Sequence, residues 1–421
     1  MAKYLTNTTD LTAVANAIRT KGGTSAQLTF PSGFVSAIEN IPSGGGIQGG
    51  YNITFNDGTD DIAIVSVEAG GTINSNPIIA TKTGYVFKGW STTSGGTTAI
   101  SFPYTPAADL TVYAIFEAEY KCTVSNLGSS SPSSVTFNKD AGFTPANLGI
   151  EEVTKGTDVF IKIPTMYRKV EATSSGQITS FTIANSKRDN SYEPYSCFVD
   201  ENGAVLEYIL IGKYWNTSSS GCVSTTAASA AGVTVGTGRS YAMAKGTGYQ
   251  LFDWQMQKLW QDLIICFKMT VNTNTGTAWT YDEMGIYWTT QGGWIDGVMG
   301  SSGTWKLCTA PTKYASLGSE SDPVPADYVS AGYSQPTTSG QEISKLGYDS
   351  NYPFFNFPTA TVSNSSYNTY YCDDYYYSAG NRPVSSLVGS AFASYGAFLC
   401  VTRFGWSHSY GVRLCYRPLS A

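Results

Sequence analysis

Residues 369–417 carry Thr-Tyr-Tyr-Cys-Asp-Asp-Tyr-Tyr-Tyr at 369–377, Asn-Arg-Pro at 381–383, Gly-Ala-Phe-Leu-Cys at 396–400 and Gly-Val-Arg-Leu-Cys at 411–415. We name residues 369–417 the C-terminal stretch. Its small and apolar segments are typical of a fixed frame, and the positions between them follow no amphipathic period. Aromatic residues and arginine supply large, stiff contact areas, whereas serine and glycine adapt to a partner. The C-terminal stretch therefore predicts a recognition surface held on a frame.

The predicted surface combines the tyrosine cluster of 370–377 with the positions between frame segments at 390–410. We expect these side chains to form one contiguous ligand-binding face. The candidate ligand-binding residues are Tyr370, Tyr371, Tyr375, Tyr377, Ser390, Phe392, Ser394, Tyr395, Val401, Arg403, Phe404, Trp406, His408 and Tyr410. In the alternative, these aromatic side chains fill a core. Their solvent exposure distinguishes the two interpretations.

The C-terminal stretch resembles the variable region of diversity-generating retroelement variable proteins, a family with a C-type-lectin-type fold and many phage tail-tip adhesins. The resemblance covers residues 150–421 and implies that adenine positions of a template are mutagenised while the frame persists. Trp406 cannot arise in this way from an asparagine codon, so either its template codon differs or it belongs to the frame. Val-Gly-Ser-Ala-Phe-Ala-Ser at 388–394 replaces the family's Gly-Gly-x-Trp-x-x-Gly, which indicates a shortened loop.

Length and composition narrow the class of protein. A chain of 421 residues is long enough for two or three domains. The net charge is -6 and no basic tract occurs, so nucleic acid is disfavoured as a partner. We expect no signal peptide and no membrane insertion, because the N-terminus lacks an apolar core and no long apolar run follows. The resemblance then implies synthesis in the bacterial cytoplasm and a final location in the virion.

Cysteine usage argues against a zinc site. The eight cysteines stand singly at 122, 197, 222, 266, 308, 372, 400 and 415, without a C-x-x-C spacing. We expect buried, reduced thiols. Cys400 and Cys415 are the first pair to test for oxidation.

Residues 1–45 predict a short helical segment. Asp10 is a candidate N-cap, and a second helix is expected to start at Pro31. The apolar positions of the two helices are Leu11, Val14, Ala15 and Ile18, followed by Phe34, Ile38 and Ile41. Such helices cannot bury enough apolar surface alone. The segment is similar to N-termini of phage tail proteins from Gram-positive hosts, which implies assembly with other tail proteins; a hairpin docked on its own chain is the alternative.

A glycine-rich linker at 43–50 marks a domain boundary, and the segment from Tyr51 to Glu119 alternates with a period of two. Strands are predicted at 51–55, 62–67, 84–90 and 110–116, with a turn at Asn-Asp-Gly 56–58. The segment resembles an internalin-type B-repeat, a β-grasp-like module that mostly serves as a spacer. We expect Trp90 to fill the core of this module instead of forming a ligand platform.

Residues 121–421 contain the remaining elements. Residues 158–164 and 166–170 predict a strand pair, and 206–215 another strand. A helix is predicted at 253–269, capped by Asp253, with an apolar stripe of Met256, Leu259, Trp260, Leu263, Ile264 and Phe267. Gly-Thr-Gly at 236–238 predicts a turn. Gly-Trp-Ile-Asp-Gly at 293–297 resembles the Trp-Val-Asp-Gly word that follows the second helix of the lectin-type family.

The predicted fold class is therefore α+β. A C-type-lectin-like domain at 121–421 follows a small β-grasp-like B-repeat domain at 46–120 and an N-terminal helical segment at 1–45. The resemblance implies a phage or prophage receptor-binding tail adhesin that binds a bacterial cell-surface protein or glycan. It also implies a homotrimer.

Enzymatic alternatives have weaker support. His408 is the only histidine and no nucleophile motif occurs, so we expect no catalytic residues, no cofactor and no metal. The strongest competitor is a tailspike-like carbohydrate depolymerase that uses two carboxylates of the C-terminal half. Its candidate carboxylates are Glu342, Asp349, Asp373 and Asp374. Formylglycine-generating enzymes are similar in scaffold and would require Cys400 and Cys415. Cation sites at Asp373 and Asp374, or at Asp322 and Asp327, are also conceivable. Hydrogen-bonded surface loops are the stronger interpretation of these aspartates, because few other acidic ligands lie nearby.

Overall fold

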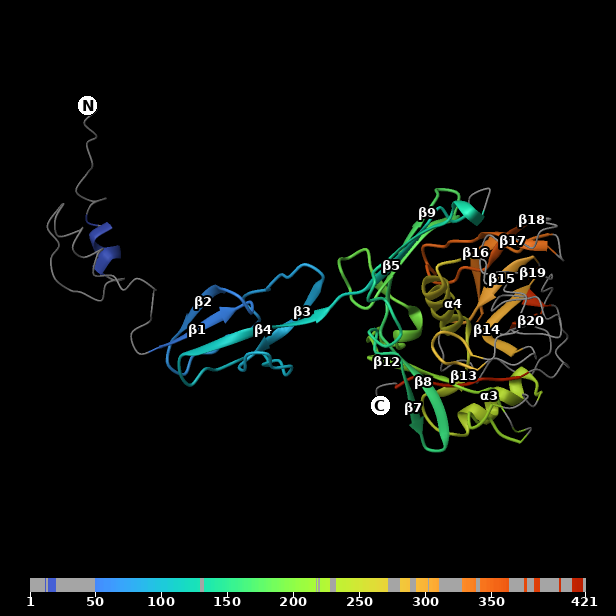
Figure 1. Ribbon diagram of the computed structural model, residues 1–421, viewed down its shortest axis with the longest axis horizontal. Coiled ribbons are helices and arrows are strands. Elements are labelled where there is room, and N and C mark those ends of the chain that lie inside the picture. The colour runs from blue at the N-terminus through green and yellow to red at the C-terminus, as the bar shows by residue number, and fades with distance from the viewer. Residues whose placement is uncertain are drawn as a thin grey trace, which may run out of the picture. The chain divides into compact units, whose positions relative to one another are not determined.

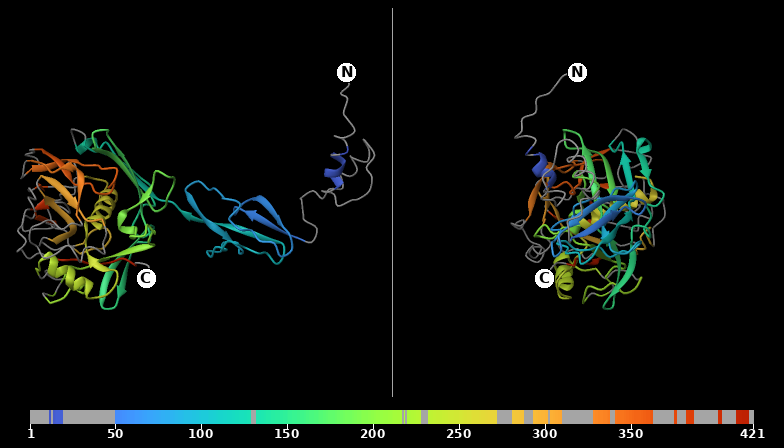
Figure 2. Two further views of the ribbon diagram at one scale, coloured as in Figure 1. Left: turned by 180° about the vertical axis from the view of Figure 1, so that it is seen from behind. Right: turned by 90° about the vertical axis from the view of Figure 1, so that its left-hand side faces the viewer.

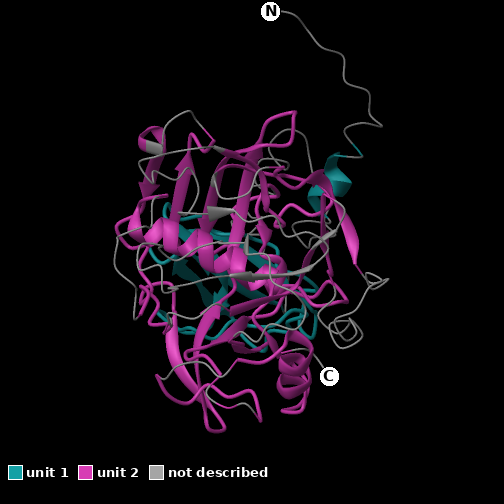
Figure 3. Ribbon diagram, turned by 90° about the vertical axis from the view of Figure 1, so that its right-hand side faces the viewer, with its two compact units in different colours: residues 1–118 teal, residues 119–421 magenta. Residues whose placement is uncertain are grey.

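The computed structural model describes residues 12, 14–19, 50–128, 132–216, 218, 220–227, 232–271, 281–287, 293–301, 303–309, 328–337, 341–362, 375–376, 382–386, 401–402 and 411–418. Among these residues strands far outnumber helices, so the protein is β-rich. The chain divides into two compact units, Met1–Ala118 and Glu119–Ala421 (Figure 3).

A short helix is present near the N-terminus. Residues 12 and 14–19 are helical, within the first predicted helix. Ala15 and Ile18 are buried, whereas Val14 is 49 % exposed. Outside the described residues lie the predicted cap Asp10, the second helix with Phe34, Ile38 and Ile41, and the linker at 43–49.

One four-stranded sheet forms the remainder of unit 1. Its strands are β1 (Tyr51–Asn56), β2 (Asp61–Val67), β3 (Tyr85–Ser91) and β4 (Leu110–Ala118), in the order β2-β1-β4-β3. The central strands β1 and β4 are parallel, and the two outer pairs are antiparallel. The four strands predicted from the period of two are confirmed.

Trp90 fills the centre of this sheet's core. Its ring is fully buried and meets Phe55 edge-to-face, with ring centroids 4.8 Å apart. The indole N–H donates to Asn76 Oδ1 and to the Ile78 carbonyl, both at 3.0 Å. A buried tryptophan is stable when its N–H has a partner. The prediction of a core role for Trp90 is confirmed.

The turn between β1 and β2 is closed by an aspartate. Asp57 Oδ1 accepts hydrogen bonds from the amides of Thr59 and Asp60, each at 2.8 Å. Gly58 has φ +100°, a left-handed conformation that residues with a Cβ adopt only with strain. The Asn-Asp-Gly signal therefore identified this turn correctly.

Two five-stranded sheets open unit 2. The first contains β5 (Lys121–Ser125), β6 (Thr136–Lys139), β9 (Tyr167–Ala172), β10 (Ile178–Ala184) and β11 (Glu193–Pro194), ordered β11-β9-β10-β5-β6. The second contains β7 (Glu151–Lys155), β8 (Asp158–Pro164), β12 (Tyr208–Gly212), β13 (Tyr249–Leu251) and β22 (Leu414–Tyr416), ordered β13-β22-β12-β8-β7. Short 3-10 turns occur at Pro132–Ser134 and Ser196–Phe198.

The predicted pairing of 158–164 with 166–170 is wrong, although both segments are strands. β8 pairs with β7 and β12, whereas β9 pairs with β10 and β11. Between them, the Thr165 amide donates to the Glu207 carbonyl at 3.0 Å and Met166 is fully buried. The chain therefore crosses from one sheet to the other here instead of reversing in a hairpin.

The helix α4 (Trp254–Lys268) lies inside the core of unit 2. Asp253 is its N-cap and accepts from the Met256 amide, and Met269 ends it in a left-handed conformation. The predicted cap is confirmed, and the apolar stripe packs in the core. Polar side chains of α4 are buried as well, so the helix is enclosed on all sides. It contacts β5 on one side and β14 on the other (Figures 1 and 2).

Two further sheets complete unit 2. One contains β14 (Gly293–Ser301), β15 (Thr304–Leu307), β16 (Val329–Ser334), β20 (Arg382–Ser386) and β21 (Val401–Thr402), ordered β16-β15-β14-β20-β21. The other contains β17 (Gln341–Leu346), β18 (Pro358–Val362) and β19 (Tyr375–Tyr376), ordered β18-β17-β19.

The predicted turn at 236–238 is wrong, because these residues lie in the helix α3 (Val235–Met243). The hydroxyl of Thr234 caps this helix by accepting from the Thr237 amide at 3.2 Å. Gly238 faces the core, where a Cβ would stand 2.6 Å from Val412 Cγ1. The glycine therefore allows close packing against Val412 and does not mark a turn.

The six described cysteines, Cys122, Cys197, Cys222, Cys266, Cys308 and Cys415, are buried, as predicted, and form no disulfide with one another. Burial raises the pKa of the Cys222 thiol to about 12 and holds the pKa of Cys415 above its usual range. Cys372 and Cys400 lie outside the described residues, so the proposed Cys400–Cys415 pair stays a prediction.

Candidate ligand-binding face and groove

Two residues of the predicted face have a described backbone. Tyr375 lies in β19 and Val401 in β21. Outside the described residues lie Tyr370, Tyr371, Tyr377, Ser390, Phe392, Ser394, Tyr395, Arg403, Phe404, Trp406, His408 and Tyr410. The exposure of the face therefore stays a prediction.

The backbone brings the two halves of the predicted face into one region. β19 pairs with β17 at Glu342↔Tyr375, and β21 pairs with β20 at Ser386↔Val401. Among the described strands each is the last of its sheet, and the two contact each other. Tyr375–Tyr376 of the tyrosine cluster and Val401–Thr402 of the 390–410 segment thus meet, although they are far apart in sequence.

The segment that closes the C-terminal stretch is part of the core. Arg413 is fully buried and donates to the carbonyls of Gly212, Lys213 and Tyr287, the last at 2.7 Å. Its guanidinium lies over the Trp215 ring, 4.4 Å from the centroid. Burial lowers the pKa of Arg413 to about 9. The 411–414 segment is therefore buried, as expected of a frame segment.

A second arginine ties the same segment to α4. The Arg417 guanidinium pairs with Asp253 Oδ2 at 2.5 Å, and both side chains are fully buried. The other oxygen of this carboxylate caps α4, and Gln250 Nε2 donates to Asp253 Oδ2 at 2.9 Å. One carboxylate therefore holds the start of the helix and the end of the C-terminal stretch.

The word Gly-Trp-Ile-Asp-Gly at 293–297 joins β14 to α3. Asp296 accepts from Arg239 Nε at 2.8 Å and from Arg239 Nη2 at 2.6 Å. The indole of Trp294 is buried and donates to the Val233 carbonyl at 2.8 Å. Bidentate arginine–carboxylate pairs fix geometry as well as position. This contact orients β14, the strand on which β20 is built.

An ion cluster in the core was missed from the sequence. Arg168 and Lys258 both pair with Asp262, at 2.9 and 2.8 Å, and all three side chains are almost fully buried. The Tyr195 hydroxyl donates to the same carboxylate at 2.8 Å. Burial and the Asp262 charge hold the pKa of Tyr195 well above its usual range. Lys258 and Asp262 have the i,i+4 spacing of an exposed helical ion pair, so their spacing does not indicate burial.

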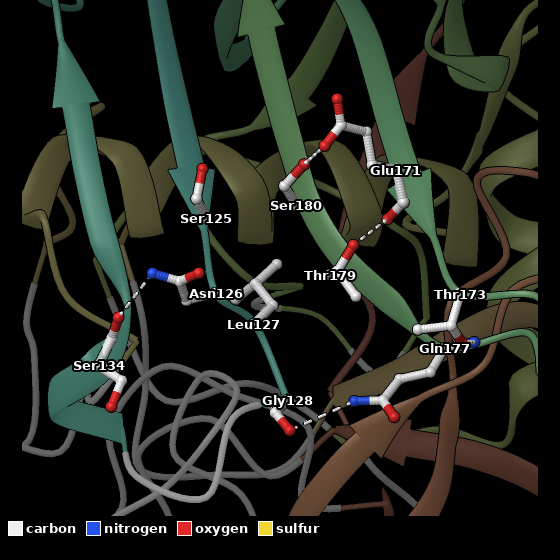
Figure 4. Close-up of a pocket in the computed structure, with 10 residues that line it drawn as sticks. All are labelled: Ser125, Asn126, Leu127, Gly128, Ser134, Glu171, Thr173, Gln177, Thr179 and Ser180. Carbon is white, nitrogen blue, oxygen red and sulfur yellow. Dashed lines mark hydrogen bonds between the residues drawn. The ribbon is translucent and has the colours of Figure 1, made fainter.

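A polar groove opens at the ends of β5, β9 and β10 (Figure 4). Its volume is about 650 Å³. Hydroxyl, amide and carboxylate side chains line it, among them Ser125, Asn126, Glu171, Gln177 and Ser180. Glu171, Ser180 and Ser125 stand side by side across three paired strands. The sequence signal was the alternation of polar with apolar residues in β5 and β10, which places hydroxyls on one face of the sheet.

Residues 51–115 match the Listeria-Bacteroides repeat domain family. The matched segment contains β1, β2 and β3 and most of β4, and it lies entirely in unit 1. No curated protein matches the chain. In this repeat domain the fully buried Trp90 offers no surface for a ligand.

Outside the repeat domain, the carboxylates proposed for a depolymerase have a limited description. Asp349 accepts from the backbone amides of Gly332 and Asn351, at 2.8 and 2.9 Å, and so closes a turn. Glu342 lies in β17. Asp322, Asp327, Asp373 and Asp374 lie outside the described residues.

Within the described ranges, no group of three or more His, Cys, Asp or Glu side chains is arranged to hold a metal ion. No helix in the described part of the chain has the length and apolar character needed to span a membrane.

Proposed function

We propose that the protein is a receptor-binding adhesin of a phage or prophage tail. In this proposal the C-terminal stretch presents an exchangeable, aromatic-rich face that binds a protein or glycan on the bacterial surface. The observation that carries the proposal is the meeting of β19 and β21, which join the tyrosine cluster to the 390–410 segment.

The division between frame and display supports this proposal. Arg413, Leu414 and Cys415 are fully buried, and Arg417 is paired inside the core. A face that varies needs a frame whose stability does not depend on the varied residues. Contacts to backbone carbonyls, as Arg413 makes, provide such support because they do not depend on neighbouring side chains.

We propose a C-type-lectin-like arrangement for unit 2. Among its described helices α4 is the second, and the Trp294–Gly297 word follows it, as the corresponding word does in the variable-protein family. The ion pair between Arg239 and Asp296 gives the 293–297 motif a structural role, because it links this motif to α3. The parallel pairing of β1 with β4 agrees with a β-grasp-like repeat domain, which we propose acts as a spacer.

We further propose that residues 1–45 attach the chain to other tail proteins and that the adhesin is a homotrimer carried on the virion. Several weak sites on one particle raise the overall affinity without any new contact.

Aromatic truncation tests the binding face. We expect Tyr395→Ala, Phe404→Ala and Trp406→Ala, made together in the full chain, to lower binding to cells of a susceptible strain at least about tenfold, because a few large side chains dominate such interfaces. Binding is measured by pull-down of labelled protein with whole cells.

Carboxylate variants provide the matched control and separate the adhesin from the depolymerase. Asp373→Asn with Asp374→Asn should leave cell binding unchanged. Wild-type binding by the aromatic variant would overturn the proposal. So would shortening of a surface polysaccharide by the wild-type protein that the carboxylate variant has lost.

A further inference from the structure

We infer that the groove at the ends of β5, β9 and β10 is a second ligand site, which binds a neutral saccharide and does not depend on the C-terminal stretch. The groove belongs to the first sheet of unit 2, whose strands end before residue 195, and is lined by residues between Ser125 and Ser180. Its proposed ligand therefore contacts a surface outside the varied segment.

The groove has the size of a small-molecule site. Its volume of about 650 Å³ lies within the roughly 300–1,000 Å³ usual for such pockets. The lining residues come from β5, β9 and β10, from the turns that follow β5 and β9, and from Ser134. In the turn after β9, Thr173 Oγ1 accepts from the Gln177 amide at 3.1 Å and shares a hydrogen bond with the Ser175 hydroxyl. A rigid lining limits the conformational entropy lost on binding.

Internal hydrogen bonds occupy one N–H of each side-chain amide in the groove and the Ser180 hydroxyl. Asn126 Nδ2 donates to the Ser134 carbonyl at 3.2 Å, and Gln177 Nε2 donates to the Gly128 carbonyl at 3.4 Å. The Ser180 hydroxyl donates to Glu171 Oε2 at 2.8 Å. Within the described residues no donor occupies the amide oxygens of Asn126 and Gln177. The groove therefore offers acceptors, fixed in place by the bonds that their own amide groups make.

An acceptor-rich groove selects a ligand that donates hydrogen bonds. No lysine or arginine lines the groove, and its single carboxylate, Glu171, has Lys169 Nζ 3.8 Å away. A phosphate or carboxylate ligand would meet the Glu171 carboxylate, with which Lys169 is already paired, and no second cation among the lining residues, so anionic ligands are disfavoured. The hydroxyls of a sugar satisfy these acceptors without bringing a charge into the groove.

The groove and the predicted face are connected by one strand. Gln177 at the groove bridges to Gly347, directly after β17, and the other end of β17 pairs with β19 at Glu342↔Tyr375. Five residues of extended chain span about 17 Å at about 3.4 Å per residue. A polymer with repeating sugar units is thus able to occupy both sites, which increases the overall affinity.

The test uses the full chain in which Phe404→Ala and Trp406→Ala remove the aromatic groups proposed for the other site. This protein is applied to an array of neutral, amino-bearing and anionic oligosaccharides, and the strongest neutral binder is then titrated by calorimetry. We expect binding to neutral oligosaccharides only. Binding confined to anionic or to amino-bearing oligosaccharides, or to none on the array, would overturn the inference.

Filling the groove should remove this binding. Thr179→Trp places a large ring among the lining residues and should weaken the titrated binding at least tenfold, whereas Thr154→Trp, at an exposed position of β7, is the matched control and should bind like the parent. Gln177→Ala, a milder change, should weaken binding severalfold and serves if Thr179→Trp fails to fold. Equal binding by Gln177→Ala and Thr154→Trp would refute the groove as the site.

Discussion

Arg239 and Asp296 illustrate how single residues hold the frame. Two nitrogens of the guanidinium meet the carboxylate, and the side chains are 9 % and 1 % exposed. Removing one partner of a buried pair leaves a charge without compensation in a site that excludes water. The pair therefore has a larger effect on stability than the ion pairs on the surface.

We expect Asp296→Ala to lower the free energy of unfolding of unit 2 by about 3–5 kcal/mol. Urea unfolding of the full chain, followed by circular dichroism, measures this loss. Lys162→Met breaks the more exposed Lys162–Glu151 pair and should cost less than about 1 kcal/mol. Similar losses for the two variants would contradict the role assigned to Asp296.

Asp57 gives the repeat domain a defined pH dependence. Hydrogen bonds from the Asp60 and Thr59 amides hold its pKa below the unfolded value of 3.8. Between these two pKa values the unfolded state binds more protons, so stability rises with pH there. The stabilisation is present above the unfolded value and is lost as the pH falls through the folded-state pKa.

Asp57→Asn keeps an acceptor oxygen but cannot ionise, so it isolates this charge effect. We make the change in a protein that comprises residues 50–118. At neutral pH we expect Asp57→Asn to have a lower melting temperature than the wild type, and in strong acid we expect the two melting temperatures to be equal. Thermal unfolding by calorimetry at the two pH values checks this expectation. A melting difference that is equal at both would show that ionisation of Asp57 has no part in it.

At the scale of elements, α3 depends on a close contact at Gly238. An alanine there would improve helix propensity by about 1 kcal/mol, but its Cβ would stand 2.6 Å from Val412 Cγ1 and 3.2 Å from Leu251 Cδ1. Overpacking of a core costs about 1–3 kcal/mol. The steric effect is the larger one.

We therefore expect Gly238→Ala to destabilise unit 2 by about 1–2 kcal/mol in urea unfolding. Adding Val412→Ala should restore part of that loss relative to Val412→Ala alone, because it opens the space that the new methyl group needs. Ser240→Ala, at an exposed position of the same helix, should be neutral or slightly stabilising. A stabilising effect of Gly238→Ala would show that the contact with Val412 is unimportant.

Elements with strong local signals were predictable from the sequence. α4 has a capping aspartate and a continuous apolar stripe, and the strands of the repeat domain alternate regularly between turn signals. α3 was missed because Gly236 and Gly238 are typical of turns, and only contact with Val412, far along the chain, explains the second glycine. The β8–β9 pairing failed because partners in a sheet depend on the whole fold.

The candidate site was predictable only in part. Its residue types suggested recognition, and the burial of Arg413 supports the predicted frame. The approach of β19 to β21 and the groove beside Gln177 arise from pairings between distant segments, which no local pattern encodes. Lys258 and Asp262 were hidden for the same reason, since enclosure of α4 by several sheets makes a surface-type pair internal.

At the scale of the whole molecule, the proposed assembly is testable by mass. We expect the full chain to sediment as a trimer and a chain beginning at Tyr51 as a monomer, because the helices predicted in residues 1–45 cannot bury enough apolar surface without partners. Sedimentation velocity at several concentrations provides the measurement. If both proteins sediment as monomers, the proposed role of residues 1–45 is contradicted. If both sediment as trimers, the assembly contacts lie in residues after 50.

β22 determines which truncated variants of this protein can complete their fold. It lies between β12 and β13 in the interior of a sheet, and it follows the C-terminal stretch along the chain. A premature stop codon within 369–410 removes this strand together with Arg413 and Arg417, so the ribosome releases a polypeptide whose central sheet cannot close. In the proposed adhesin, only chains that are translated through residue 417 can therefore complete this sheet, whatever side chains the candidate binding face carries.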